Sequence, residues 1–171
     1  KGVDFVCTTA LRVDPDEQLV YTEKDNYPYD ELIIATGPKV NFDIAPGIRE
    51  HAMYIGTPTG AMKTREKMDE FIKNPGPIVI GATQNAGCMG AAYEFLFNVE
   101  KWLRDQHIRK KVDLYWITPE DYLGHFGIDG MPGGEKMLRL FMKMFNIHFK
   151  TQAAVKEVTT EGILLSTEIG R

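Results

Sequence analysis

The stretch Pro77-Ile-Val-Ile-Gly81-Ala-Thr-Gln-Asn-Ala-Gly87-Cys-Met-Gly90 decides the fold of this chain. Its first residues, 77–82, are apolar and suit a strand buried on both faces of a parallel sheet. A glycine-bearing loop at 81–90 follows, and then apolar side chains at helical spacing: Ala92, Phe95, Leu96, Val99, Trp102 and Leu103. Residues 112–118 predict a second strand. The order strand, glycine loop, helix, strand is that of a βαβ unit.

Two further helices and a strand extend this unit. Thr57 followed by Pro58 predicts a helix that starts there and runs to about Lys73. Its buried face is expected to hold Ala61, Met68, Phe71 and Ile72. Another helix follows a loop at 119–134, and a strand is predicted at 147–149. We interpret the Met and Phe stripe of that helix as core packing; it consists of Met137, Leu138, Phe141, Met144 and Phe145.

The end of the chain repeats its beginning. Strands are predicted at 3–10 and 18–22 around a tight turn, and a buried strand is predicted at 31–36. The pattern of residues 10–20 recurs at 155–165 with a constant offset, so that Val13 matches Val158 and Leu19 matches Leu164. We infer two copies of one domain type.

These elements predict an α/β protein with a Rossmann-like three-layer dinucleotide-binding fold and antiparallel hairpin crossovers. Residues 1–41 would be the C-terminal part of a first domain and 42–58 the connection. Residues 59–171 would be a second domain that lacks its last strand. The chain begins with Lys1 and not with Met, which we interpret as a piece of a longer protein.

Composition excludes several classes of protein. The 171 residues carry a net charge of −4 and 43% hydrophobic residues, which indicates a folded, soluble chain and argues against nucleic-acid binding. No apolar run approaches the roughly 20 residues of a membrane helix. Two cysteines are too few for a disulfide scaffold and favour a reducing, cytoplasmic location.

The glycine loop is the first candidate site. A helix start after a strand suits a phosphate, but the dinucleotide motif G-x-G-x-x-G is not kept, because Thr83 stands where its second glycine belongs. An acidic residue usually ends the second strand and binds the ribose, whereas here that strand ends at Thr118-Pro119, with Glu120 just beyond.

Cys88 is the second candidate. At the start of a helix, unpaired N–H groups and the helix dipole favour a thiolate nucleophile, whereas a small packed cysteine is the alternative. Cys7 lies in a predicted strand and is interpreted as a core residue.

His125, between glycines in the long loop, is a candidate proton carrier or a loop histidine bonded to a carbonyl. No metal-ligand spacing occurs, so we expect no metal site. The run Arg109-Lys110-Lys111 is interpreted as a solvated helix end.

Three segments resemble one known family. Tyr29-Asp-Glu-Leu-Ile-Ile-Ala-Thr-Gly-Pro-Lys39 is similar to the strand that closes the flavin domain of two-dinucleotide-fold flavoproteins. The segment from Ile80 to Phe95 resembles the second-domain loop of sulfide:quinone oxidoreductases, and Pro119 to Ile128 resembles another stretch of that family. The resemblance covers nearly the whole chain.

The resemblance implies FAD in the first domain and cysteine redox chemistry in the second. Sulfide sulfur would be taken up by a cysteine pair, two electrons would reduce FAD, and a quinone would reoxidise it. Cys88 matches one redox cysteine and His125 a histidine thought to handle protons. Ala35, Thr36 and Gly37 match backbone near the flavin nucleotide, and Ala10 matches backbone at the adenine.

Two departures accompany the resemblance. Gly56 and Gly60 stand where many members carry a cysteine and a histidine, and the opening glycine motif, a later cysteine, the quinone site and the C-terminal membrane contact are not in this sequence. The isolated chain is expected to be inactive. An NAD(P)H-dependent flavoprotein and a non-catalytic paralogue remain alternatives. The resemblance is compatible with a homo-oligomer and with association at the inner face of a membrane.

Overall fold

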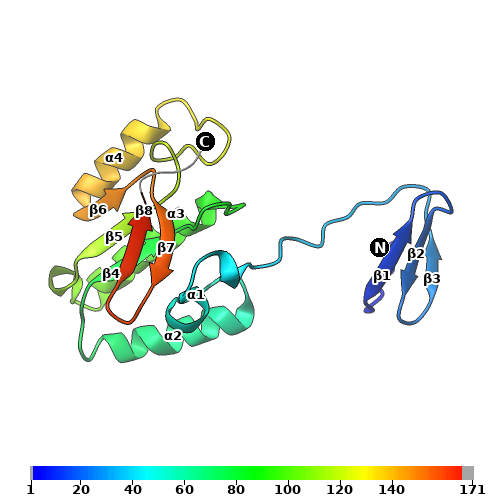
Figure 1. Ribbon diagram of the computed structural model, residues 1–171, viewed down its shortest axis with the longest axis horizontal. Coiled ribbons are helices and arrows are strands. Elements are labelled where there is room, and N and C mark those ends of the chain that lie inside the picture. Colours follow the sequence, from blue (N-terminus) through cyan, green and yellow to red (C-terminus); the bar gives the residue numbers. More distant parts are fainter. Residues whose placement is uncertain (1, 167–171) are drawn as a thin grey trace. The chain divides into compact units, whose positions relative to one another are not determined.

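The computed structural model describes residues 2–166. The chain divides into two compact units, Lys1–Lys39 and Val40–Arg171. The first unit holds an antiparallel sheet in the order β1-β2-β3 (Figure 1). Its strands are β1 (Ala10–Asp14), β2 (Leu19–Thr22) and β3 (Asn26–Pro28). The turn between β1 and β2 is closed by Asp14, whose carboxylate accepts the backbone N–H groups of Asp16 and Glu17.

Two strands expected in this unit do not form. Residues 3–9 and 31–36 have no strand structure, and the side chain of Ile33 is 90% exposed. The apolar pattern of 31–36 suits a strand with neighbours on both sides, but no described strand pairs with this segment. Cys7, expected in the core, is exposed for the same reason.

The second unit is built on a parallel sheet in the order β4-β5-β6, in which Ile78 pairs with Leu114 and Leu114 with Ile147. The strands are β4 (Ile78–Gly81), β5 (Leu114–Ile117) and β6 (Ile147–Lys150). Helix α3 (Met89–Asp105) and the short η2 (Arg109–Lys111) lie between β4 and β5, and α4 (Gly134–Met144) precedes β6. The predicted βαβ unit is confirmed.

The segment before β4 contains η1 (Phe42–Ile44), α1 (Ile48–His51) and α2 (Pro58–Phe71). Helix α2 begins as predicted, because the Thr57 hydroxyl accepts the N–H of Gly60 and Pro58 occupies the first turn. Among residues 2–166, no helix combines the length and apolar character needed to cross a membrane.

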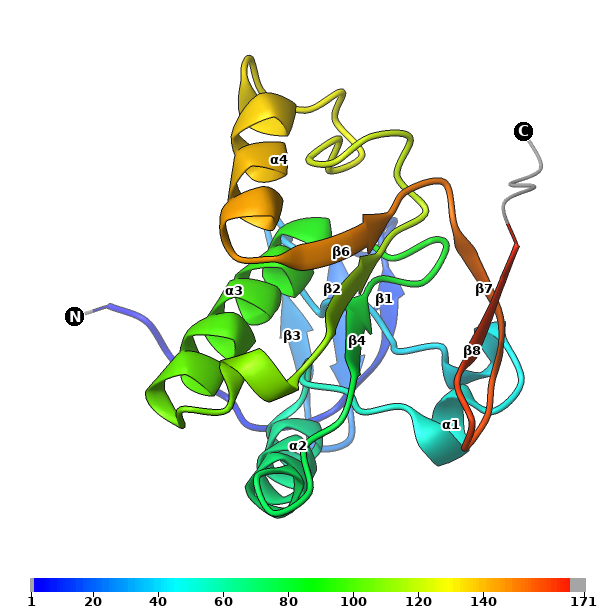
Figure 2. The ribbon, with the colours of Figure 1, turned by 90° about the vertical axis from the view of Figure 1, so that its left-hand side faces the viewer.

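The sheet separates two apolar clusters. Leu114 and Trp116 are fully buried in the larger one, with side chains of α3 and α4. Ile117 belongs to the smaller one, with Ile48 of α1 and Val155 of the hairpin formed by β7 (Ala154–Val158) and β8 (Ile163–Ser166). Figure 2 shows α3 and α4 on one side of the sheet and this hairpin on the other. The unit is thus a three-layer α/β fold.

Three helix positions expected in the core are exposed. They are Ala61 of α2 and Met137 and Met144 of α4. On α4 the buried side chains are Leu138, which was expected in the core, and Met142, which was not; they lie four residues apart on one face.

The β7–β8 hairpin repeats β1–β2, but the constant offset is wrong for the second strand. In the first hairpin Val13 pairs with Val20. By the constant offset these residues correspond to Val158 and Leu165, but Val158 pairs with Ile163. Four residues therefore separate Val158 from its partner, against six between Val13 and Val20, whereas the strands of the two hairpins have the same lengths. Both hairpins carry a register irregularity in their first strand, between Ala10 and Arg12 and between Val155 and Glu157.

Candidate functional site

Cys88 lies where the sequence places it, at the N-cap of α3. The residue is exposed, its thiol is free, and its side chain makes no capping hydrogen bond. The N–H groups of the first turn of α3 therefore have no side-chain partner at the cap, and no acidic residue lies in that turn. Cys88 thus lies at the positive end of the helix dipole in an accessible position.

The loop that leads to Cys88 is held in its first half, at Gly81 and Gln84. A Cβ at Gly81 would lie 2.1 Å from the carbonyl oxygen of Ile117, so only glycine allows β4 and β5 to approach this closely. Gln84 is tied to the hairpin: its amide nitrogen donates to the carbonyl of Val155 and its amide oxygen accepts the N–H of Val155, both at 3.0 Å. By contrast, a Cβ at Gly87 or Gly90 would meet nothing within 4 Å, so the space beside the thiol is open.

His125 lies in the loop after β5 and is half-buried. Its Nδ1 accepts the N–H of Gly127 at 3.1 Å, and its Nε2 lies 3.3 Å from a carboxylate oxygen of Asp129. A ring that accepts at Nδ1 carries its proton on Nε2 when neutral. The backbone carbonyl of His125 accepts N–H groups from Ile128 and Gly130, which closes the loop around this residue. The imidazole itself accepts a hydrogen bond from a backbone N–H and lies near a carboxylate, so the predicted bond to a carbonyl is not the contact that the ring makes.

A buried carboxylate anchors the loop of His125. Glu120 is 6% exposed and accepts the hydroxyl hydrogens of Tyr93 at 2.8 Å and Thr118 at 2.7 Å. Its other oxygen accepts the N–H of Phe126 at 2.8 Å, and the Tyr93 hydroxyl accepts the N–H of Gly124 at 3.1 Å. Burial, and then the bond to Glu120, raises the pKa of the Tyr93 phenol. The sequence showed Glu120 only as an acid beyond a strand, and no local signal linked it to Tyr93.

The structure brings the elements that carry Cys88 and His125 together. Both loops leave the carboxyl ends of neighbouring parallel strands, which is the usual ligand-binding edge of such sheets. The bond from Gly124 to Tyr93 joins the loop of His125 to the first turns of α3. The ring centroids of Tyr93 and Phe126 lie 5.4 Å apart, edge to face, and add an apolar contact between the same two elements.

The residues predicted to contact the flavin lie in the first unit. Ala10 begins β1 and is exposed, and Ala35, Thr36 and Gly37 lie in an exposed segment without regular structure. Gly37 has a φ of +72°, and a Cβ there would meet nothing within 4 Å.

Other candidate groups do not add to the site. Among residues 2–166, no group of His, Cys, Asp or Glu is placed to hold a metal ion. The two glycines of the connection are packed against Tyr54: a Cβ at Gly60 would lie 2.4 Å from its carbonyl oxygen, and a Cβ at Gly56 would lie 1.9 Å from its hydroxyl. A cysteine or histidine at these positions would thus displace Tyr54 or the local backbone.

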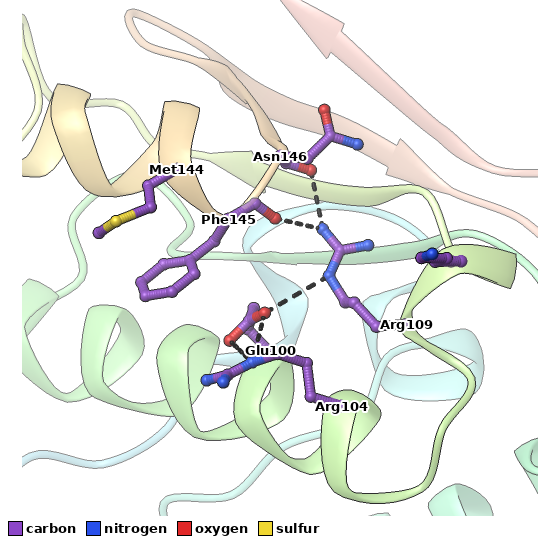
Figure 3. Close-up of a pocket in the computed structure, with 7 residues that line it drawn as sticks. Glu100, Arg104, Arg109, Met144, Phe145 and Asn146 are labelled. Carbon is purple, nitrogen blue, oxygen red and sulfur yellow. Dashed lines mark hydrogen bonds and ion pairs between the residues drawn. The ribbon is translucent and has the colours of Figure 1, made fainter.

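A cavity of about 250 Å³ lies at the other end of the sheet, near the end of α3 and the starts of β5 and β6 (Figure 3). Arg109 is directed into it and corrects our interpretation of the basic run, because its guanidinium is not solvated. It donates to the carbonyls of Phe145 at 2.6 Å and Asn146 at 2.8 Å, and its Nε lies 3.7 Å from the buried Glu100. These contacts cap the end of α4, which is a structural role.

Comparisons with known proteins identify the relatives of this chain. No family model matches the sequence. A sulfide-quinone reductase from Aquifex aeolicus is 37% identical over 164 residues, which are 95% of this chain and 38% of that protein. A mitochondrial sulfide:quinone oxidoreductase from Dictyostelium discoideum is 32% identical over 120 residues, which are 67% of this chain and 26% of that protein.

Solved structures agree with the sequence comparison. The X-ray structure of the sulfide:quinone oxidoreductase from Aquifex aeolicus superposes with a TM-score of 0.89 at 36% identity, over 98% of this chain and 39% of that one. A ferredoxin reductase from Rhodopseudomonas palustris shares the fold alone, with a TM-score of 0.65 at 15% identity over 94% of this chain and 37% of that one. Over the part of their length that it covers, this chain is therefore a homologue of the sulfide:quinone oxidoreductases.

Proposed function

We propose that this chain is part of a flavin-dependent enzyme that oxidises sulfide and reduces a quinone. The observation that carries the proposal is the exposed thiol of Cys88 at the N-cap of α3, in a chain that is 37% identical to a sulfide-quinone reductase. The chain spans 38% of that relative, and the quinone site and the second redox cysteine that the proposal requires would lie outside this sequence.

FAD is the cofactor that the proposal requires. Ala10, Ala35, Thr36 and Gly37 would hold its nucleotide through backbone groups, and the open backbone at Gly37 is compatible with this role. When bound, the flavin supplies a two-electron acceptor between sulfur and quinone. The residues in this chain then have to bind the sulfur and handle protons.

Cys88 would hold the sulfur of sulfide as a persulfide, and this S–S bond forms only with loss of a proton and two electrons, which the bound flavin would accept. The N–H groups at the start of α3 have no side-chain partner at the cap and would be available to stabilise negative charge there, and open space at Gly87 and Gly90 leaves room for a substrate. His125 would carry the proton released by hydrogen sulfide. Its neutral ring carries a proton on Nε2, near Asp129, so the incoming proton would be accepted at Nδ1 in place of the N–H of Gly127.

Two contacts speak against the NAD(P)H-dependent alternative. The acid that would bind a nicotinamide nucleotide's ribose is Glu120, and its carboxylate is buried and hydrogen-bonded to Tyr93 and Thr118. The loop that would receive the pyrophosphate is tied to the hairpin by Gln84. Both features leave the loop suited to a thiol and not to a dinucleotide.

The intact flavin-containing protein tests the proposal. Sulfide should bleach the flavin absorbance within seconds, and a short-chain quinone should restore it. Cys88→Ser should slow the bleaching by at least about 100-fold, because a hydroxyl is a far weaker nucleophile than a thiolate. Bleaching by NADH in place of sulfide would overturn the proposal in favour of the alternative. Unchanged ligand binding in Cys88→Ser, with no turnover in either protein, would indicate a non-catalytic paralogue.

A further inference from the structure

The backbone on both sides of His125 is held by side chains from outside its loop. Gly124 donates its N–H to the hydroxyl of Tyr93, and Phe126 donates its N–H to Glu120. Tyr93 also donates to Glu120, so the two anchors form one network. Tyr93 lies on α3, in the turn after the one that Cys88 begins. The network therefore connects the helix of the thiol with the loop of the imidazole.

The network holds a buried carboxylate with neutral partners. Glu120 accepts three hydrogen bonds, from Tyr93, Thr118 and Phe126, and among the described residues it makes no ion pair. Burying a carboxylate is costly unless all its acceptor positions are used, and apolar packing would stabilise the fold at lower cost. Such a network is suited to fixing one geometry, because its hydrogen bonds are directional.

The loop also adopts a conformation that needs support. Phe126 has a φ of +55°, which is unfavourable for a residue with a side chain. Its N–H is bound by Glu120, and its ring packs edge to face on Tyr93. The same two residues thus hold the strained position directly after His125.

We propose that Glu120 and Tyr93 are positioning residues that set the place of His125 relative to the helix start at Cys88. The inference rests on the proposed function for the roles of Cys88 and His125. Glu120 and Tyr93 act on His125 through the backbone of residues 124 and 126, to which their side chains are hydrogen-bonded.

A double-mutant cycle in the intact flavoprotein tests this proposal. Tyr93→Phe removes the hydroxyl that bonds Glu120 and Gly124 but keeps the ring that stacks on Trp116, at 4.1 Å between centroids. Sulfide-dependent flavin reduction at saturating sulfide should slow by about 10- to 100-fold, with the half-saturating concentration nearly unchanged. In the double variant with His125→Ala, the rate should equal that of His125→Ala alone within about twofold, because the loop then has nothing to position. Additive losses would indicate a merely structural role and overturn the proposal.

Hydrogen exchange measures the loop separately from catalysis. The amides of residues 121–130 should exchange at least about 10-fold faster in Tyr93→Phe and in Glu120→Gln. The first variant removes the acceptor of the Gly124 N–H, and the second replaces the charged acceptor of the Phe126 N–H by a neutral amide. Two exposed positions serve as matched controls: Tyr115→Phe on the same sheet and Asp121→Asn next to Glu120. Neither substitution should change the rate of flavin reduction by sulfide or the exchange rate of the loop amides. Unchanged exchange in both network variants would overturn the proposal. If the wild-type protein is not reduced by sulfide, the proposed function fails, and the exchange rates alone decide whether these residues fix the loop.

Discussion

Two apolar segments of similar pattern, 31–36 and 77–82, have different structures in this chain. Both were expected to form strands buried in a parallel sheet. Residues 78–81 form β4, in which Ile80 is 8% exposed, whereas residues 31–36 form no strand and Ile33 is 90% exposed. Local composition therefore does not separate them.

The difference lies in the neighbours that each segment finds. β4 pairs along its whole length with β5, from Ile78 with Leu114 to Gly81 with Ile117, and α3 returns the chain to that position. No described strand pairs with residues 31–36. A buried parallel strand is thus a property of a βαβ unit and not of the strand sequence, because its backbone groups need partners before its side chains can be buried.

Matched isoleucine substitutions give the largest expected effect. Ile80→Ala removes a core side chain and should lower the free energy of unfolding by about 2–5 kcal/mol. Ile33→Ala removes a side chain that is already hydrated and should change it by less than about 0.5 kcal/mol. Urea unfolding of the same polypeptide measures both. Equal losses would mean that residues 31–36 are buried in solution, which would end the distinction between the two segments.

Glycine substitutions sharpen the comparison within the second unit. Gly81→Ala would place a Cβ 2.1 Å from the backbone oxygen of Ile117, so β4 and β5 would have to separate. We expect a loss of about 1–3 kcal/mol in unfolding free energy. Gly87→Ala meets open space in the same loop and should stay within about 0.5 kcal/mol. Thermal unfolding that ranks these two variants the other way round would contradict the pairing of β4 with β5.

Alkaline titration gives the smallest effect. The pKa of Tyr93 is raised in the folded protein, so its neutral form contributes stability that is complete below the unfolded value near 10. This contribution falls as the pH rises above 10, because the unfolded state loses the phenol proton first. Tyr93→Phe should therefore flatten the decline in unfolding free energy above pH 10 by up to about 1.4 kcal/mol per pH unit. Tyr27→Phe, in the first unit, is the control. If it flattened the decline in unfolding free energy above pH 10 as much as Tyr93→Phe does, the pH dependence could not be assigned to Tyr93.

Much of the second unit followed from the sequence because its signals are local. The glycine loop, the helical spacing after it and the start of α2 at Thr57 each depend on residues within one or two turns. The position of Cys88 at a helix start came from the same pattern. The roles of Cys88 and His125 remain predictions.

The polar contacts that organise the site did not follow from the sequence. Gln84 bonds to Val155, and Glu120 bonds to Tyr93, over separations of 71 and 27 residues. Whether a glutamate beyond a strand faces solvent or turns inward depends on which hydroxyl groups the fold brings to it. The exposed Met137 and Met144 show the same limit, since periodicity gives a helix two apolar edges and tertiary packing selects one.

The register irregularity in the first strand of each hairpin has a consequence for the shape of that hairpin. It falls before Val13 in one hairpin and before Val158 in the other. An extra residue of this kind bends its strand and increases the local right-handed twist. Each hairpin is therefore expected to bend within its first strand, and not at its turn.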